Sequence, residues 1–265
     1  MLQKLTLISS LFFASTVLAN PSQNFVTFGD SLADNGYKDG HGFNRYSNGR
    51  VWPEYVSEKL NLHLDDRAWG GAQSGEGNIN GLQWSGLLWQ VKQYLAKDKP
   101  NQHTVYSIGA GLNDLLLGQD QSKAVVQNLD SAIQLLAKQG AGKIIVFNLP
   151  DVTQAPAYEK NPMFKNAKNL VEANLNKTNV AFKNQETLWQ KTYPNTQFCF
   201  VDLSHFLKKE VGSKQFENTK DAWQGTYINP AEHAYLWWDE WHPMTAAHEI
   251  LADHVMNTCE TMLKG

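Results

Sequence analysis

The chain of 265 residues has little of three things that often reveal a protein's class: cysteine, net charge and long apolar runs. Two cysteines are too few for a disulfide framework or a cysteine-rich zinc module. The formal net charge of −3 argues against the basic footprint of a nucleic-acid-binding protein. A mean hydropathy of −0.44 argues against a polytopic membrane protein. What is present, 42% hydrophobic residues and nine tryptophans, suffices for a sizeable core.

The N-terminus has the pattern of a secretory signal. Lys4 supplies a positive charge, an apolar run covers residues 5–18, and Val17-Leu18-Ala19 offers the small residues that signal peptidase reads. The run falls short of the ~20 residues needed to span a bilayer. We therefore predict a signal peptide at residues 1–19, a single domain at residues 20–265, and a secreted or periplasmic protein. An uncleaved tail or a first core element is the alternative.

The predicted export determines whether the two cysteines can form a lasting disulfide. In an oxidising compartment a disulfide between Cys199 and Cys259 can persist. Two buried free thiols are the alternative, because cysteine also behaves as a small apolar residue. The sequence leaves both open.

Strand-like and helix-like segments alternate along the rest of the chain. Short apolar runs typical of strands lie at residues 25–28, 104–108, 143–148 and 198–203. Helical patterns lie at residues 87–95, 122–136 and 164–189, with Ser122 as a candidate N-cap. This alternation, without internal repeats or a flexible linker, predicts one α/β domain with a mostly parallel sheet. Active-site groups are then expected at the carboxyl ends of the strands.

The first predicted strand ends at Gly29-Asp30-Ser31-Leu32, which places Ser31 on a turn at that edge. A serine hydroxyl is a weak nucleophile and needs a base, usually a histidine that a carboxylate holds. The Gly-x-Ser-x-Gly elbow of the α/β-hydrolases is absent, since Asp30 and Leu32 flank Ser31. Any serine chemistry therefore belongs to another lineage.

His242 is the best placed of the eight histidines to act as that base. In Asp239-Glu240-Trp241-His242-Pro243 a carboxylate precedes the histidine by three residues, so a short loop can bring Asp239 onto the imidazole. Pro243 disfavours helix at His242, and Thr245 is a candidate cap for a following helix. A surface Asp-x-x-His in an ordinary loop is the alternative for this motif alone.

No metal or other cofactor is indicated. His248 and His254 are six residues apart, whereas the zinc helix motif needs its histidines four apart, so the two rings face different sides of a helix.

An ester carbonyl under attack develops an oxyanion, which needs preorganised hydrogen-bond donors. Three candidates lie at strand ends: the Ser31 N–H, a backbone N–H of Gly70 or Gly71, and the Asn113 side-chain amide. Gly71 suits the role because a glycine N–H can approach a ligand closely. Taken singly, the two glycines also fit a plain turn, and Asn113 also fits a helix start.

Together these blocks resemble the signature of the GDSL, or SGNH, hydrolases. They occur in the expected order as Phe28-Gly29-Asp30-Ser31-Leu32, Gly70-Gly71-Ala72, Gly111-Leu112-Asn113-Asp114 and Asp239-Glu240-Trp241-His242-Pro243. The segment from Tyr235 to Pro243 looks most like the branch of bacterial lysophospholipases, thermolabile haemolysins and glycerophospholipid:cholesterol acyltransferases. One departure is Met244, where that branch commonly has threonine.

The resemblance implies a three-layer α/β/α, flavodoxin-like fold with a parallel five-stranded sheet. It implies Ser31 as nucleophile, His242 as base and Asp239 as its orienting acid. It also implies an oxyanion hole formed by the Ser31 N–H, the Gly71 N–H and Asn113 Nδ2. Three further carboxylates are expected to brace the turns: Asp30, Asp34 and Asp114.

The implied function is a secreted serine esterase that hydrolyses acyl esters of lysophospholipids or phospholipids through an acyl-enzyme. A sterol hydroxyl that competes with water would make it an acyltransferase. The same blocks also serve esterases of small water-soluble or acetylated carbohydrate esters. A non-catalytic binding module is a third alternative, disfavoured because such a module has no need for all four of Ser31, Asn113, Asp239 and His242.

The expected partner is the lipid or other ester substrate, with transient contact at a membrane surface; neither nucleic acid nor an obligate protein partner is indicated. The predicted loop that carries Asp239 and His242, here called the Asp-His loop, is rich in tryptophan: Trp237, Trp238 and Trp241. They would either form an interfacial loop or pack beneath the loop and hold it. Residues 39–48 would either line the mouth of the site or form a surface turn.

Overall fold

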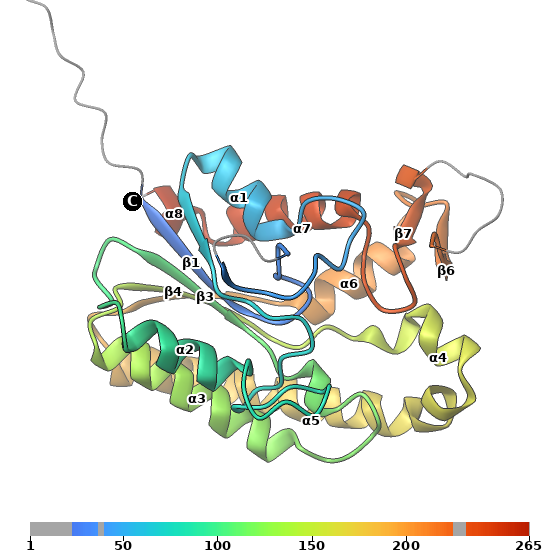
Figure 1. Cartoon of the computed structure of the whole chain (residues 1–265), viewed down its shortest axis with the longest axis horizontal. Helices are drawn as coiled ribbons and strands as arrows, with labels where there is room; N and C mark the ends of the chain where they lie inside the picture. The colour runs from blue at the N-terminus through green and yellow to red at the C-terminus, as the bar shows by residue number, and fades with distance from the viewer. Residues whose placement is uncertain (1–22, 37–39, 225–231, 265) are drawn as a thin grey trace, which may run out of the picture.

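The computed structural model describes residues 23–36, 40–224 and 232–264 (Figure 1). The predicted signal peptide lies outside these residues. No helix in the described ranges is both long and apolar enough to cross a bilayer.

Five parallel strands form the central sheet, in the order β2-β1-β3-β4-β5. They are β1 (Asn24–Gly29), β2 (His63–Asp66), β3 (Val105–Gly109), β4 (Lys143–Phe147) and β5 (Gln197–Val201). This is the strand order of the flavodoxin-like fold, so the predicted class and sheet are confirmed. The apolar runs marked four of these strands but not β2, because β2 is a polar edge strand with the sequence His-Leu-Asp-Asp.

Helices cover both faces of the sheet (Figure 1). One face carries α2 (Leu87–Leu95), α3 (Ser122–Lys138) and α5 (Pro162–Thr192), and the other carries α1 (Trp52–Leu60), α6 (Leu203–Gly212), α7 (Thr245–Thr258) and α8 (Glu260–Lys264). Successive residues of a strand point to opposite faces. Val26 accordingly packs in the core under α2 and α3, while its neighbour Phe25 packs in the core under α1 and α7. The result is the predicted three-layer arrangement.

Shorter elements complete the chain around the carboxyl edge of the sheet. They are the 3-10 turns η2 (Leu112–Asp114), η3 (Val152–Gln154) and η4 (Glu232–Ala234), the short helix α4 (Pro156–Lys160), and a two-stranded parallel sheet of β6 (Asn218–Ala222) and β7 (Tyr235–Trp237).

Both predicted helix caps are wrong by one residue. Ser122 and Thr245 are the first residues of α3 and α7, and neither stands in the capping position before the helix. The Thr245 N–H instead donates to Asn48 Oδ1 at 2.8 Å. At α7 a side chain distant in sequence therefore accepts one of the free N–H groups of the first turn.

Cys199 on β5 and Cys259 after α7 form a disulfide, with 5.7 Å between their Cα atoms. Of the two alternatives open from the sequence, the structure contains the bridged form. The bond ties the edge strand of the sheet to the C-terminal helices and closes a loop with a sequence separation of 60.

The double variant Cys199→Ser/Cys259→Ser should lower the free energy of unfolding by about 2–4 kcal/mol, because the unfolded chain regains loop entropy. Urea unfolding of oxidised protein measures this loss. Wild-type protein kept reduced is the control and should resemble the double variant. Two alkylatable thiols in the oxidised wild type would contradict the bridge.

Candidate active site

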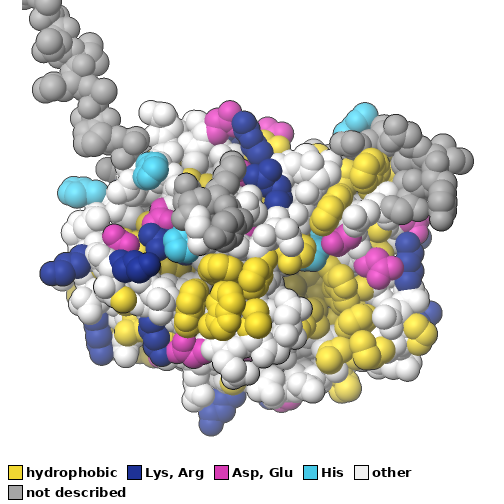
Figure 2. Space-filling view, viewed as in Figure 1, with side chains coloured by type: hydrophobic (Ala, Val, Ile, Leu, Met, Phe, Trp, Pro, Cys, Tyr) yellow, Lys and Arg dark blue, Asp and Glu magenta, His cyan; other side chains and the backbone are white. Residues whose placement is uncertain are grey.

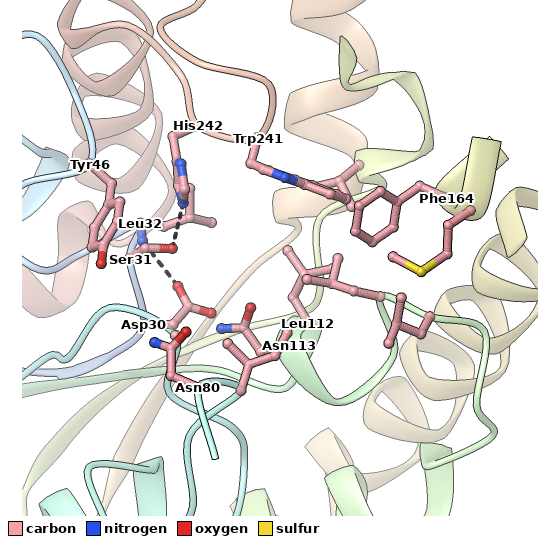
Figure 3. Close-up of a pocket in the computed structure, with 16 residues that line it drawn as sticks. Asp30, Ser31, Leu32, Tyr46, Asn80, Leu112, Asn113, Phe164, Trp241 and His242 are labelled. Atoms are coloured by element: carbon pink, nitrogen blue, oxygen red, sulfur yellow. Dashed lines mark hydrogen bonds between the residues drawn. The ribbon is translucent and has the colours of Figure 1, made fainter. Parts of the chain in front are cut away.

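The carboxyl edge of the sheet opens into a cavity of about 320 Å³ (Figure 3). Ser31 follows β1, Gly71 lies in the loop after β2, and Asn113 lies in η2 after β3. His242 comes from the loop between β7 and α7. All four line the cavity, so the fold brings together residues that are far apart in the sequence.

Ser31, His242 and Asp239 form one hydrogen-bonded row. His242 Nε2 lies 2.9 Å from Ser31 Oγ, and His242 Nδ1 lies 2.8 Å from Asp239 Oδ2. A carboxylate at Nδ1 favours the tautomer with its proton there, which leaves Nε2 free to accept the Ser31 proton. The arrangement is that of a nucleophile, a base and an orienting acid.

The loop around Asp239 explains why this carboxylate stays in place. Asp239 Oδ1 accepts the backbone N–H groups of Trp241 and His242, each at 2.7 Å. Burial raises the pKa of Asp239, but the bond to the His242 ring and these two N–H groups outweigh it, so the pKa lies below its usual value. Asp239 is therefore ionised at neutral pH and stabilises a positive charge on His242.

The two glycines that compete for the oxyanion hole differ in the structure. The Gly70 N–H donates to Asp34 Oδ2 at 2.7 Å and is occupied. Gly71 lines the cavity with a φ of +76°, where a Cβ would lie 2.7 Å from Asn78 Oδ1. The geometry therefore favours Gly71 as the donor, as the resemblance implies.

Asn113 reaches the cavity in a fixed orientation. Its Nδ2 donates to the Ala72 carbonyl at 2.9 Å. Since an amide nitrogen carries two hydrogens, the second is left for a ligand in the cavity. The bond also joins η2 to the loop that carries Gly71.

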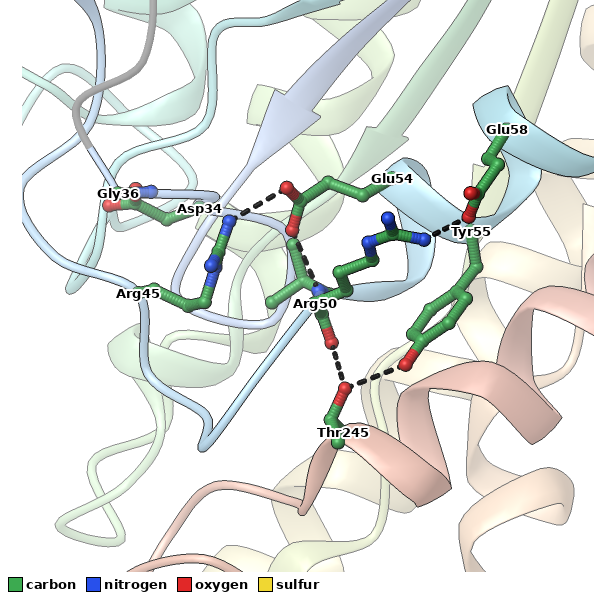
Figure 4. A network of polar contacts seen from close by, with 9 residues as sticks. Asp34, Gly36, Arg45, Arg50, Glu54, Tyr55, Glu58 and Thr245 are labelled. Carbon is green, nitrogen blue, oxygen red and sulfur yellow. Dashed lines mark hydrogen bonds and ion pairs between the residues drawn. The ribbon is translucent and has the colours of Figure 1, made fainter. Parts of the chain in front are cut away.

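The carboxylates of Asp34 and Asp114 both stabilise the loop that carries Gly71, in the bracing role that the sequence suggested. Asp34 is buried, and Figure 4 shows it beside Gly36, whose N–H it accepts. Its other oxygen accepts the Phe43 and Gly70 N–H groups. Asp114 accepts both the N–H and the hydroxyl of Ser74, each at 2.8 Å.

Asp30 lies in the cavity wall directly before Ser31 and is 5% exposed. Its carboxylate accepts the Leu32 N–H at 3.0 Å, so it also braces the turn. Burial raises the pKa of Asp30 to about 6, although the Leu32 N–H and the charge of His242 act in the opposite direction. Asp30 therefore exchanges its proton close to neutral pH, a property that its sequence context does not reveal.

Tyr46 belongs to residues 39–48, which the sequence left as either the mouth of the site or a surface turn, and it lines the cavity. Its ring centroid lies 4.8 Å from that of His242 (Figure 3), and the two planes are tilted by 35°. The same ring lies over Gly70, where a Cβ would be 2.2 Å from Tyr46 Cε2. Gly70 thus leaves the space in which Tyr46 packs against the imidazole.

Of the three tryptophans near Asp239 and His242, Trp237 is buried, whereas Trp238 and Trp241 are half-buried. Trp237 is 1% exposed, and its Nε1 donates to the Thr219 carbonyl at 2.9 Å. Trp241 lines the cavity with its ring centroid 4.7 Å from that of Phe164 and 5.3 Å from that of Tyr158. These rings support the loop that carries Asp239 and His242.

His248 and His254 lie in different surroundings. His248 is fully buried, and burial lowers its pKa to about 3, so its ring is neutral. His254 packs against Phe206, with 5.3 Å between the ring centroids. Within the described residues, no group of three or more histidine, cysteine, aspartate or glutamate side chains could hold a metal ion.

Comparison with known proteins agrees with this geometry. A family model described as GDSL-like lipase/acylhydrolase matches residues 25–255. The chain belongs to this family. The matched range contains all four sequence blocks, and GDSL membership supports carboxylic ester hydrolysis as the chemistry of the chain.

Two curated relatives belong to the branch that the sequence indicated. The GDSL chain is 26% identical over 271 residues to the thermolabile hemolysin of Vibrio parahaemolyticus serotype O3:K6, covering 89% of this chain and 64% of that protein. It is 31% identical over 157 residues to the phosphatidylcholine-sterol acyltransferase of Aeromonas hydrophila, covering 50% of this chain and 46% of that protein. The alignments thus cover less than two thirds of either relative.

Solved structures share the fold of this GDSL chain. A lipolytic protein of the G-D-S-L family from Veillonella parvula DSM 2008 has a TM-score of 0.52 and 16% identity, over 88% of this chain and 96% of that one. A carbohydrate acetylesterase from Sinorhizobium meliloti has a TM-score of 0.55 and 12% identity, over 91% of this chain and 100% of that one. At these identities the likeness concerns the fold alone.

Replacing Asp30 by Asn should change how stability depends on pH. The folded protein binds the Asp30 proton more tightly than the unfolded chain, so this group's contribution to stability is complete below pH ~4 and is lost as pH rises through about 6. The loss amounts to about 3 kcal/mol at 1.36 kcal/mol per pKa unit. Asp30→Asn should therefore be more stable than wild type at pH 8 by up to that amount, and equal to it near pH 4.

Urea unfolding at both pH values measures this difference. The exposed Asp221→Asn is the control and should show no such pattern. A gain for Asp30→Asn that is the same at pH 4 and pH 8 would contradict the assignment of the effect to the Asp30 proton.

Gly70→Ala should lower kcat by about ten- to a hundredfold, because the added methyl group pushes Tyr46 off the imidazole of the base. Tyr46→Phe keeps the ring and should stay close to wild type. Gly212→Ala is the matched control, since a Cβ there meets nothing within 4 Å. Steady-state kinetics with a soluble ester measures the effect. Equal impairment of Gly70→Ala and Tyr46→Phe would refute a role for the ring packing.

Proposed function

We propose that the chain is a secreted serine esterase that hydrolyses the acyl ester of lysophospholipids and phospholipids. The observation that carries this proposal is the hydrogen-bonded row of Ser31, His242 and Asp239 at the polar end of an otherwise apolar cavity. The pattern of residues 1–19 supports export, and the names of the curated relatives support a lipid substrate.

The apolar part of the cavity suits an acyl chain. Its wall away from Ser31 consists of aliphatic, thioether and aromatic side chains: Leu112, Leu116, Leu117, Val152, Met163, Phe164 and Trp241. A volume of about 320 Å³ holds about ten methylene-sized groups, if each takes about the 30 Å³ of a liquid water molecule. One fatty acyl chain of medium length fits this space.

In the proposed reaction, His242 Nε2 removes the proton of Ser31 Oγ as the oxygen attacks the acyl carbonyl carbon. The oxyanion accepts hydrogen bonds from the Ser31 N–H, the Gly71 N–H and Asn113 Nδ2. When the tetrahedral intermediate collapses, the C–O bond to the alcohol breaks and His242 gives the alcohol its proton. Asp239 stabilises the imidazolium between these steps.

Water then attacks the acyl-enzyme by the same route and releases a fatty acid. A sterol hydroxyl in place of that water would give a sterol ester, which is the acyl transfer that the name of the Aeromonas relative describes. Both acceptors meet the same acyl-enzyme, so the triad does not select between them. We propose hydrolysis as the main outcome and acyl transfer as a secondary one.

Ser31→Ala should reduce the hydrolysis of lysophosphatidylcholine by about 10⁴-fold or more, because no other group can form the acyl-enzyme. Fatty acid release measures the activity, and the exposed Ser131→Ala serves as a matched control. The same assay should compare phosphatidylcholine, short-chain p-nitrophenyl esters and acetylated sugars. Retained activity of Ser31→Ala would overturn the nucleophile, and turnover of acetylated sugar without lipid release would favour the carbohydrate esterase.

A further inference from the structure

The apolar wall of the cavity continues onto the outer surface of the protein. Ile79, Leu117 and Met163 line the cavity and yet are 43%, 48% and 56% exposed. They come from three separate segments: the loop before α2, the turn after η2 and the first turn of α5. The same side chains therefore face both Ser31's cavity and the solvent.

Two more exposed apolar side chains lie on the segments that form the cavity wall, although they do not line the cavity themselves. Leu170 on α5 lies beside Gly118, where a Cβ would be 3.1 Å from the Leu170 Cβ, and Gly118 directly follows Leu117. Trp84 is on the same loop as Ile79, and its ring centroid lies 5.3 Å from that of Trp69. We call these five residues, Ile79, Trp84, Leu117, Met163 and Leu170, the apolar rim. Figure 2 shows hydrophobic side chains gathered on both sides of a hollow on this face.

Three lysines on the neighbouring elements form ion pairs with carboxylates close by. Lys168 Nζ lies 2.7 Å from Glu159 Oε1, Lys177 Nζ lies 2.6 Å from Asp120 Oδ2, and Lys92 pairs with Glu76. Among the described residues that line the cavity, none is lysine or arginine. The five rim side chains are themselves uncharged, so their attraction to a partner is apolar.

We infer that the apolar rim docks on a zwitterionic lipid surface, from which an acyl chain passes into the cavity along Ile79, Leu117 and Met163. The inference rests on the proposed function for the identity of the molecule that fills the cavity. Moving exposed apolar side chains out of water lowers the free energy, and tryptophan favours the boundary between water and lipid. A lipid layer suits this rim because it provides apolar groups for contact with the rim and also contains the substrate.

The test uses the Ser31→Ala protein, which cannot consume the lipid. Co-sedimentation with phosphatidylcholine vesicles measures the partition coefficient of this parent and of two further variants, Trp84→Ser and Leu170→Ser. Each should reduce the partition coefficient by about tenfold, since one large apolar contact is lost. Leu188→Ser is the matched control, because Leu188 is 52% exposed on α5, close to the 60% of Leu170, but lies about 38 Å along the helix from Met163. Binding of the parent should persist at high salt.

Three results would overturn the docking surface. The first is unchanged partition of both rim variants, or an equal loss with Leu188→Ser. The second is binding that needs anionic phosphatidylglycerol and disappears at high salt. The third is a rim that mediates self-association, seen as a change in sedimentation of the rim variants without vesicles and no binding to vesicles. Leu170 is exposed on the helix surface, so its replacement keeps the test valid even if Trp84→Ser is unstable.

A separate measurement distinguishes this inference from the proposed function. With Ser31 intact, Leu170→Ser should hydrolyse a soluble short-chain ester at the wild-type rate, while its activity on phosphatidylcholine vesicles falls in proportion to its binding. Vesicle binding through the rim without any lipid or ester hydrolysis would refute the esterase and leave the docking surface in place.

Discussion

The position of the base, His242, depends on hydrogen bonds between residues 47–50 and residues 243–245. Ser47 Oγ donates to the Pro243 carbonyl at 3.0 Å, and the Thr245 hydroxyl donates to the Arg50 carbonyl at 2.9 Å (Figure 4). These bonds fix the start of α7, and His242 lies three residues before it. The 2.9 Å contact between His242 and Ser31, 211 residues apart in sequence, is therefore set by a segment that takes no part in the reaction.

The buried carboxyl groups around the site lower the stability of the fold. Burial raises the pKa values of Asp30, Asp34 and Asp114, which means that their ionised forms are less stable here than in water. In return they accept backbone N–H groups that would otherwise be unpaired, and they hold the turns of Ser31 and Gly71 rigid. Preorganised donors of this kind are what stabilisation of an oxyanion requires. The buried carboxyl groups therefore make the fold less stable but keep the site rigid.

The cavity has two parts with different chemistry. Polar groups at the strand ends surround Ser31, while side chains from η2, η3, α5 and the loop of Trp241 form an apolar wall. The polar part comes from the sheet edge common to flavodoxin-like folds, and the apolar part comes from the connections between the strands. Ester chemistry and the choice of ester therefore depend on different parts of the chain.

Local sequence patterns predict the strands with apolar runs, the order of the four blocks and the Asp-x-x-His turn, because each depends on neighbours along the chain. These patterns do not show β2, whose polar residues become a strand only by pairing with β1. The choice between Gly70 and Gly71 depends on Asp34, and the packing of Tyr46 on His242 depends on the folded chain, so both required the structure. The burial of Trp237 and the exposure of Trp84 likewise follow from the fold. Burial and long-range partners depend on what the fold brings alongside a residue, which no local pattern contains.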